Sequence, residues 1–190
     1  MRILTILICL YSLPAAAGFI ELSATGSVRE NAVDEDNSTT TRSVTGSLAY
    51  YFYENSAIQI SYTEGFMESE GLANVSGTNI AYDQVVNFQM TGLDFILSGG
   101  GKNAILKPYL KAGGAYQTKR VEFQLEGSEK YVEETDGTFI TYGLGFKLQL
   151  TKNWAIKAGY DGWTGPVDSE NENEEEQTDT VIRAGISFIF

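Results

Sequence analysis

The last eleven residues of the chain, Thr180 to Phe190, alternate strictly between two kinds of side chain. Apolar and aromatic residues fill most of one parity, whereas the other parity carries Arg183, Gly185 and Ser187. Since successive side chains of a β-strand point to opposite faces, the segment predicts a strand with one apolar and one polar face. This pattern is typical of a strand that meets lipid on one side and a packed polar lumen on the other.

Apolar alternation recurs in seven further segments, which together with the last one predict eight strands, an even number. The segments are 20–28, 44–52, 58–62, 86–90, 106–116, 140–150 and 154–160. In the fourth, Val86, Phe88 and Met90 form the apolar face, and we expect them to point outward. The next residues, Gly92 to Phe95, interrupt the pattern, so we expect a bulge or an early end of the strand to accommodate Asp94.

Long acidic connections alternate with short turns between these segments. The long ones are 30–39, 64–83, 120–135 and 163–179, and the short ones are 54–56, 98–103 and 151–153. Outer-membrane barrels have this arrangement, with long loops outside and short turns in the periplasm. Alternation alone also fits a soluble β-sandwich, but an open sheet edge in lipid would leave backbone groups unpaired. We therefore predict an all-β, eight-stranded antiparallel up-and-down transmembrane β-barrel with four long outer loops and three short periplasmic turns.

The third long connection has an alternation of its own, in which Val121, Phe123 and Leu125 oppose Glu122 and Gln124. Two interpretations remain open. The segment forms a hairpin that extends the barrel strands and packs over the barrel mouth, or it is a surface loop with chance alternation. The glycine-rich turn at 98–101 is expected to need a positive φ, which glycine adopts without steric cost.

Residues 1–17 have the anatomy of a secretory signal peptide. Arg2 precedes an apolar run from Ile3 to Leu13, and Pro14-Ala15-Ala16-Ala17 provides an A-x-A cleavage site. A membrane anchor is the alternative, but about eleven residues are too few to cross a ~30 Å hydrocarbon layer as a helix. We expect cleavage after residue 17, which leaves a barrel domain of residues 18–190 without Cys9, the single cysteine.

The expected mature chain has a net charge near −13, because removing Arg2 leaves 12 basic against 25 acidic residues. This balance argues against nucleic acid as a partner, since phosphate binding needs clustered Lys and Arg. Solvated loops are the expected use of the acidic clusters, and divalent ions that bridge them to lipopolysaccharide phosphates are an intermediate possibility. The clusters lack the spacing of an EF-hand, so we expect no metal centre and no cofactor. The weak candidate ligands are Asp34, Asp36, Asp168, Glu170 and Glu172.

Seven charged side chains point into the lumen on this register. They are Glu21, Lys107, Lys111, Lys147, Lys157, Asp161 and Arg183. An eight-stranded barrel is just wide enough for side chains to fill it, and buried charges must be paired. We therefore predict an ion-pair and water network that plugs the lumen. Basic groups outnumber acidic ones in this set, so Tyr51, Tyr53, Tyr109 and glutamines are expected as further partners.

Aromatic residues on the outward parity are expected to form girdles at the two membrane interfaces. They are Tyr50, Tyr62, Tyr142, Tyr160 and Trp154, with Trp163 near the outer rim. Histidine is absent from the whole chain, so a hydrolase or acyltransferase of this architecture lacks its usual base. We therefore expect no enzyme activity and assign no catalytic residue.

The chain resembles the small outer-membrane β-barrel superfamily, which includes the OmpA transmembrane domain, OmpX and OmpW. The resemblance rests on the signal peptide, the eight alternating strands, the segment Lys107–Tyr116 and the terminal Ile186–Phe190. It implies an integral protein of the outer membrane of a Gram-negative bacterium, in contact with outer-membrane lipids and lipopolysaccharide. In this superfamily the assembly machinery reads the terminal aromatic residue, which implies an assembly signal. Its residues are Ile186, Phe188 and Phe190.

Two functions are implied by analogy with this superfamily. The first is a non-enzymatic barrel with a plugged lumen that serves envelope integrity or surface contacts through acidic outer loops. The alternative is a narrow OmpW-like channel for small or apolar solutes. The two differ in whether the lumen conducts.

Overall fold

The computed structural model describes residues 18–34, 37–75, 78–101, 104–125, 130–166 and 176–190. The expected signal peptide lies outside these ranges. Among the described residues, no helix is long and apolar enough to cross a membrane. The strands are β1 (Phe19–Asp34), β2 (Asn37–Tyr53), β3 (Ser56–Val75), β4 (Thr78–Ser98), β5 (Leu106–Leu125), β6 (Tyr131–Gln149), β7 (Trp154–Pro166) and β8 (Glu176–Ile189).

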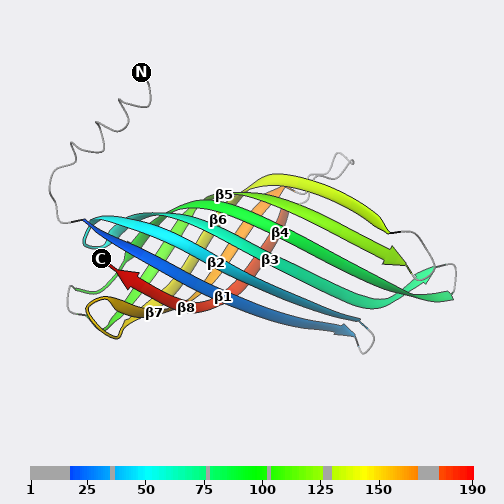
Figure 1. The fold of residues 1–190 in the computed structure, drawn as a ribbon, viewed down its shortest axis with the longest axis horizontal. Coiled ribbons are helices and arrows are strands. Elements are labelled where there is room, and N and C mark those ends of the chain that lie inside the picture. The colour runs from blue at the N-terminus through cyan, green and yellow to red at the C-terminus, as the bar shows by residue number, and fades with distance from the viewer. Residues whose placement is uncertain (1–17, 35–36, 76–77, 102–103, 126–129, 167–175) are drawn as a thin grey trace, which may run out of the picture.

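Each strand pairs with its neighbours in the chain in antiparallel orientation, and β1 pairs with β8, so the sheet closes on itself (Figure 1). The closing ladder runs from Glu21↔Ile189 to Gly26↔Ala184. Beyond it, the backbone N–H of Phe190 donates a hydrogen bond of 2.9 Å to the carbonyl oxygen of Ile20. The predicted eight-stranded up-and-down barrel is confirmed.

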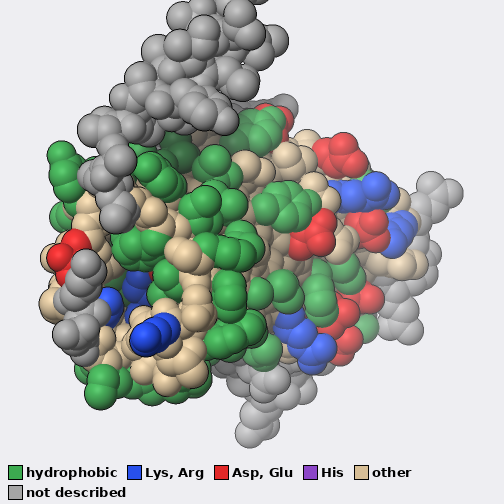
Figure 2. Space-filling model, turned by 60° about the vertical axis from the view of Figure 1, so that its left-hand side comes forward, with side chains coloured by type: hydrophobic (Ala, Val, Ile, Leu, Met, Phe, Trp, Pro, Cys, Tyr) green, Lys and Arg blue, Asp and Glu red, His purple; other side chains and the backbone are tan. Residues whose placement is uncertain are grey.

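The outer wall of the barrel is apolar. Leu22, Leu48, Ile60 and Ile186 on this wall are each at least 42% exposed, although they are large hydrophobic residues. Figure 2 shows hydrophobic side chains over the barrel wall, and acidic and basic side chains gathered on the part of the strands that extends beyond it. A continuous apolar wall of this kind is stable against acyl chains rather than against water.

Strand β4 faces the other way from our expectation. Val86 and Met90 point into the barrel and are each 6% exposed, whereas Asn87 points outward. The ladders from β4 to β3 and to β5 pass through residues 92–95 without a register shift. Asp94 is therefore neither in a bulge nor beyond the strand end, and it lies in the lumen with 3% exposure.

The apolar face of β4 changes because of where the segment lies along the barrel axis. Residues 86–90 lie on the outer part of β4, where apolar side chains gain more from packing inward over the barrel mouth than from facing outward. Nearer the turn that joins β4 to β5, Leu93, Phe95 and Leu97 supply the apolar outer face of the strand. The alternation is thus continuous along β4, and only the face that is apolar changes.

Strand pairing continues into all four of the long connections. The β1–β2 ladder extends to Asp34↔Asn37, and the β7–β8 ladder extends to Pro166↔Glu176. The β3–β4 ladder extends to Val75↔Thr78, and the β5–β6 ladder extends to Phe123↔Tyr131. The third connection is thus a hairpin, in which Phe123 stacks on Tyr82 with ring centroids 6.0 Å apart. The β6–β7 ladder ends at Ile140↔Thr164, and β1–β6 extend further along the barrel axis toward the outer end than β7 and β8 (Figure 1).

The opposite end of the barrel carries the short turns. The chain passes from Tyr53 of β2 to Ser56 of β3 through two residues. In the turn before β7, the hydroxyl oxygen of Thr151 accepts a hydrogen bond of 3.0 Å from the backbone N–H of Trp154. Gly100 has a φ of 87°, so the expected positive φ in the turn after β4 is confirmed.

Gly185 lies where β8 closes on β1, and a larger residue does not fit there. An added Cβ would overlap the carbonyl oxygen of Ala24 and lie 2.6 Å from the Cα of Thr25, both of which are backbone atoms. We expect Gly185→Ala to destabilise the folded barrel by about 1–3 kcal/mol, as in other overpacked sites. Urea unfolding in lipid vesicles measures this difference.

Gly46→Ala is the matched control, because a Cβ at Gly46 meets no heavy atom within 4 Å. We expect it to change the free energy of unfolding by less than about 0.5 kcal/mol. Equal effects of the two substitutions would show that the β1–β8 seam has room for a Cβ.

Candidate functional site

Glu21 of β1 is the centre of a buried ion cluster near the turn end of the lumen. Its side chain is 1% exposed, and its Oε2 lies 2.8 Å from the Nζ of Lys147. The Nζ of Lys157 lies 3.3 Å from the other carboxylate oxygen. Lys147 also donates a hydrogen bond to the hydroxyl of Tyr51, whose ring stacks on Phe19 with centroids 4.2 Å apart. One carboxylate therefore holds two ammonium groups that come from β6 and β7.

Asp161 and Asp94 form a second cluster nearer the outer end. The Nζ of Lys111 lies 3.0 Å from Asp161 Oδ2 and 3.9 Å from Asp94 Oδ2. Arg183 reaches Asp161 Oδ2 at 3.3 Å, and the hydroxyl of Thr141 donates to Asp94 Oδ1 at 2.5 Å. These five residues connect β4, β5, β6, β7 and β8 across the lumen.

Hydroxyl groups fill the side of the lumen formed by β1, β2 and β3. Ser23 and Ser47 are hydrogen-bonded at 2.6 Å, and the hydroxyls of Thr45 and Thr63 are hydrogen-bonded at 2.8 Å. These short side chains leave space for the longer charged ones that reach across from the other strands. The lumen thus has a hydroxyl wall facing an ionic wall.

Little free volume remains among these residues. A cavity of about 30 Å³ lies between the two walls and is lined by Asp161, Arg183 and Lys157, among others. A cavity needs about 10–15 Å³ to hold a water molecule, so this one has room for ordered water. Asp161 Oδ1 and two guanidinium nitrogens of Arg183 are buried without a protein partner, so they provide hydrogen-bonding groups for such a water. Side chains therefore fill the lumen almost completely at the level of the two ion clusters.

The structure brings together six of the seven expected lumen residues. Lys107 differs, because it lies beside the turn at Gly100 and makes no ion pair among the described residues. Tyr53, expected as a further partner, is 70% exposed and lies at the end of β2. Asp94 was missed as a lumen acid. The alternation of Leu93 and Phe95 with their polar or small neighbours was the signal that could have identified it.

The expected girdle residues face outward at two levels. Tyr62, Tyr142, Tyr160 and Trp154 are between 39% and 46% exposed, and Tyr50 is partly buried. Near the outer level, the hydroxyl of Tyr62 donates to Glu64 at 2.8 Å. This hydrogen bond places a charged group directly above the aromatic level on the outer wall.

One tyrosine and one tryptophan differ from the expected girdle: Tyr116 was not expected in it, and Trp163 does not face outward. Tyr116 also faces outward, and its hydroxyl donates to Asp136 at 2.5 Å. Trp163 faces into the barrel, is 8% exposed, and packs with Phe139 and Val181. It lies on the lumen parity of β7, so it does not belong to the outer aromatic girdle.

The residues expected as an assembly signal, Ile186, Phe188 and Phe190, lie at the end of β8 on the outer wall. Phe188 contacts both Trp154 and Phe190 edge-on, with ring centroids 4.8 Å apart in each pair. Ile186 and Phe190 are 53% and 65% exposed. The end of β8 therefore presents an apolar surface.

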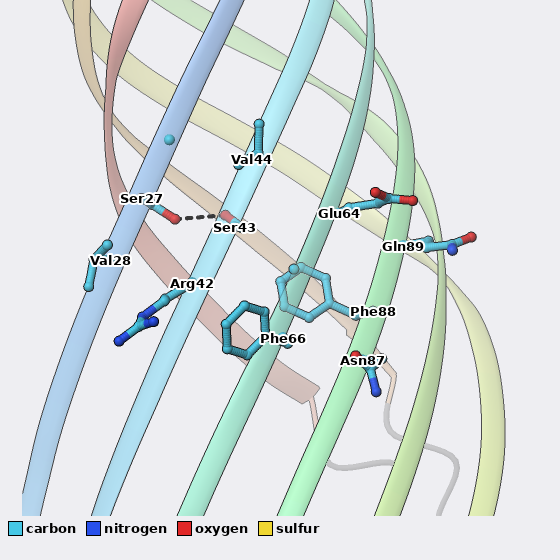
Figure 3. A pocket seen from close by; sticks show the side chains of 12 residues that line it. Ser27, Val28, Arg42, Ser43, Val44, Glu64, Phe66, Asn87, Phe88 and Gln89 are labelled. Atoms are coloured by element: carbon cyan, nitrogen blue, oxygen red, sulfur yellow. Dashed lines mark hydrogen bonds between the residues drawn. The ribbon is translucent and has the colours of Figure 1, made fainter.

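A groove lies on the outer side of β1–β4, with a volume of about 760 Å³ (Figure 3). The guanidinium of Arg42 lies 5.9 Å from the ring centroid of Phe66. The ring of Phe88 lies over Gly65, where an added Cβ would overlap it. Charged and apolar side chains mix here, so the groove marks the outer limit of the apolar wall on these strands.

No group of three or more His, Cys, Asp or Glu residues that could hold a metal ion occurs in the part of the chain that the structure describes. Asp34 is the last residue of β1. The other weak candidates lie outside the described residues; they are Asp36, Asp168, Glu170 and Glu172.

No protein-family model matches the chain. Outer membrane porin F of Pseudomonas aeruginosa is 27% identical to it over 146 residues. The match covers 76% of this chain but only 37% of that protein, so the chain spans little more than a third of the relative's length.

Two solved structures have the same architecture. The N-terminal β-barrel domain of Pseudomonas aeruginosa OprF is 23% identical with a TM-score of 0.56, and the match covers 90% of this chain and 97% of that domain. The outer membrane protein OprG from Pseudomonas aeruginosa is 12% identical with a TM-score of 0.57, over 91% of this chain and 95% of that one. These similarities show the fold.

Proposed function

Because the chain is an eight-stranded β-barrel of the bacterial outer membrane, we propose that it is a closed, non-enzymatic barrel that serves envelope integrity or surface contact. The ionic lumen supports this proposal. Glu21, Asp94 and Asp161 are each at most 7% exposed, and each is bound to at least one cation from another strand. A permeating solute would have to separate these buried pairs, which costs several kcal/mol for each charge left unpaired.

The outer part of the barrel supports a role in surface contact. Exposed acidic side chains cover the extended portions of β3, β4 and β6, and they lie above the apolar wall. They are Glu64, Glu68, Glu70, Asp83, Glu133, Glu134 and Asp136. Such a surface favours basic partners, or divalent ions shared with other anionic groups.

Planar-bilayer recording tests the closed lumen. We expect the full chain, refolded from denatured protein to exclude contaminating porins, to give no discrete conductance steps. Insertion is verified separately by heat-dependent migration and by protection from protease. Reproducible steps from inserted protein would contradict the closed lumen and favour the narrow channel, the alternative that the word porin in the relative's name supports.

The terminal aromatic residue is proposed to act in assembly. Phe190→Ala retains the backbone N–H that bonds Ile20, whereas deletion of Phe190 removes that hydrogen bond as well. We expect both variants to lower the amount of heat-modifiable barrel in cells, and Phe190→Tyr to retain it. If only the deletion lowered assembly, the role of Phe190 would be strand closure rather than recognition of its ring.

A further inference from the structure

A second internal cavity lies above the ionic clusters, at the outer mouth of the barrel. Its volume is about 350 Å³, which is within the range of small-molecule pockets. We call it the vestibule. Its lining shares no residue with the two ion clusters, so binding of a ligand in the vestibule does not depend on whether the lumen conducts. Its apolar wall consists of Met67, Val86, Phe88, Val121, Trp163 and Val181.

Two residues that line the vestibule each have a buried polar atom without a protein partner. Gln117 is 2% exposed and its Oε1 accepts no hydrogen bond, and Trp163 is 8% exposed and its Nε1–H has no acceptor. A buried polar group without a partner is unfavourable, because it has lost its hydrogen bonds to water. A molecule in the vestibule that offers one donor and one acceptor satisfies both atoms.

The described residues of the lining include two cationic side chains. They are Lys119 and Arg29, and Asp179 is the one carboxylate among the described lining residues. The Nζ of Lys119 lies 5.7 Å from the ring centroid of Phe139, which packs on Trp163. Arg29 donates a hydrogen bond of 3.1 Å to the carbonyl oxygen of residue 180, across strands β1 and β8.

Among the described residues, the β1–β8 ladder ends at Gly26↔Ala184, although both strands continue outward. Strands β1–β6 extend further toward the outer end of the barrel than β7 and β8 (Figure 1). The vestibule lies between the ion clusters and the outer end of the barrel, so a ligand that enters from the outer side does not pass the ion clusters.

We propose that the vestibule binds a small amphipathic hydroxy-carboxylate. The apolar body packs on Trp163, Phe88 and the valines. The carboxylate accepts hydrogen bonds from the Trp163 indole N–H and the Lys119 ammonium, and the hydroxyl donates to Gln117 Oε1.

Mandelate has all three features and is soluble, so it is the probe. The full chain is labelled with ¹⁵N at its tryptophan indoles and reconstituted in nanodiscs, and the two indole resonances are followed by NMR. Trp154 lies on the outer wall at the other end of the barrel and is an internal control. A Trp154→Phe variant assigns the two signals.

We expect a saturable shift of the Trp163 signal, with the Trp154 signal unchanged. Phenylethanediol, which replaces the carboxylate by a hydroxymethyl group, should bind at least about tenfold more weakly. Phenylacetate, which lacks the hydroxyl, should also bind more weakly than mandelate. Lys119→Met should weaken mandelate binding by about tenfold or more. Lys130→Met is the matched control on the same hairpin, because Lys130 pairs with Glu122 outside the vestibule.

Three results would overturn the proposal. They are the absence of a saturable shift at Trp163, equal shifts of both indoles, and equal affinities for mandelate and phenylethanediol. The third comparison uses the unaltered chain, so the test stands even if Lys119→Met does not fold. A water-filled vestibule gives the first of these results.

Discussion

Glu21→Gln is expected to destabilise the folded barrel by about 3–5 kcal/mol, the cost of removing one partner from a buried ion pair. The Glu21 carboxylate binds both Lys147 and Lys157, and these ammonium groups have no other acidic partner in the described structure. The glutamine keeps the shape of the side chain and removes only its charge. Urea unfolding from lipid vesicles, followed by tryptophan fluorescence, measures the loss.

Glu122→Gln is the matched control for this substitution. Glu122 also binds two cations, with Lys130 Nζ at 2.5 Å and Arg120 Nε at 3.2 Å, but both cations are more than half exposed. Exposed ion pairs contribute about 0–1 kcal/mol, so the control should unfold almost like the unaltered chain. Adding Lys147→Met to Glu21→Gln should recover part of the lost stability, because one unpaired charge is then removed. If Glu21→Gln alone were neutral, the cluster would not be held by charge.

Ile156→Arg is expected to destabilise the barrel by about 2–4 kcal/mol, the cost of an arginine facing the middle of the bilayer. Ile156 is 40% exposed on the outer wall, and its ladder partners Leu148 and Ile186 face outward beside it. No polar side chain is paired with it on either neighbouring strand. The same unfolding measurement detects the effect.

Two further arginine substitutions distinguish the effect of the face of the strand from the effect of depth in the bilayer. Thr141→Arg places the guanidinium in the lumen beside Asp94, which binds Thr141 at 2.5 Å, so we expect a smaller loss than for Ile156→Arg. Thr138→Arg lies on the outward face of β6 but in its outer part, opposite Tyr116, where the cost should fall to about 0–1 kcal/mol. Equal losses at positions 156 and 141 would mean that the two faces of the wall are wrongly assigned.

Much of the lumen was predictable because its pattern is local. Charged residues on one parity of a strand whose other parity is apolar, such as Arg183 between Ile182 and Ala184, can only point inward once the sheet closes in lipid. The inward positions of Glu21, Lys147 and Asp161 result from the same two-residue period. The ion-pair partners of these residues do not follow from that period. Pairing depends on the position along the barrel axis of residues on strands that are distant in the sequence.

The differences arose where that local rule changes along a strand. Val86 and Met90 are apolar and face inward because they lie beyond the apolar wall. The sequence pattern predicts their face of β4 to be the outer one, so it does not assign Asp94, on the same face, to the lumen. Lys107 shares the parity of Lys111 but lies at the barrel end, so no acid of the described strands pairs with it. Gln117 and Trp163 gave no sequence signal of a common cavity.

The sequence by itself determined the number of strands, the closure of the sheet and the side that most residues face, because a period of two and the cost of unpaired backbone in lipid leave few alternatives. The tertiary structure decided which charges meet and where the lumen is filled. Those depend on the stagger between neighbouring strands, which sets Glu21 opposite Lys147 and Asp161 opposite Lys111. Stagger is a property of the closed barrel and is not encoded within any one strand.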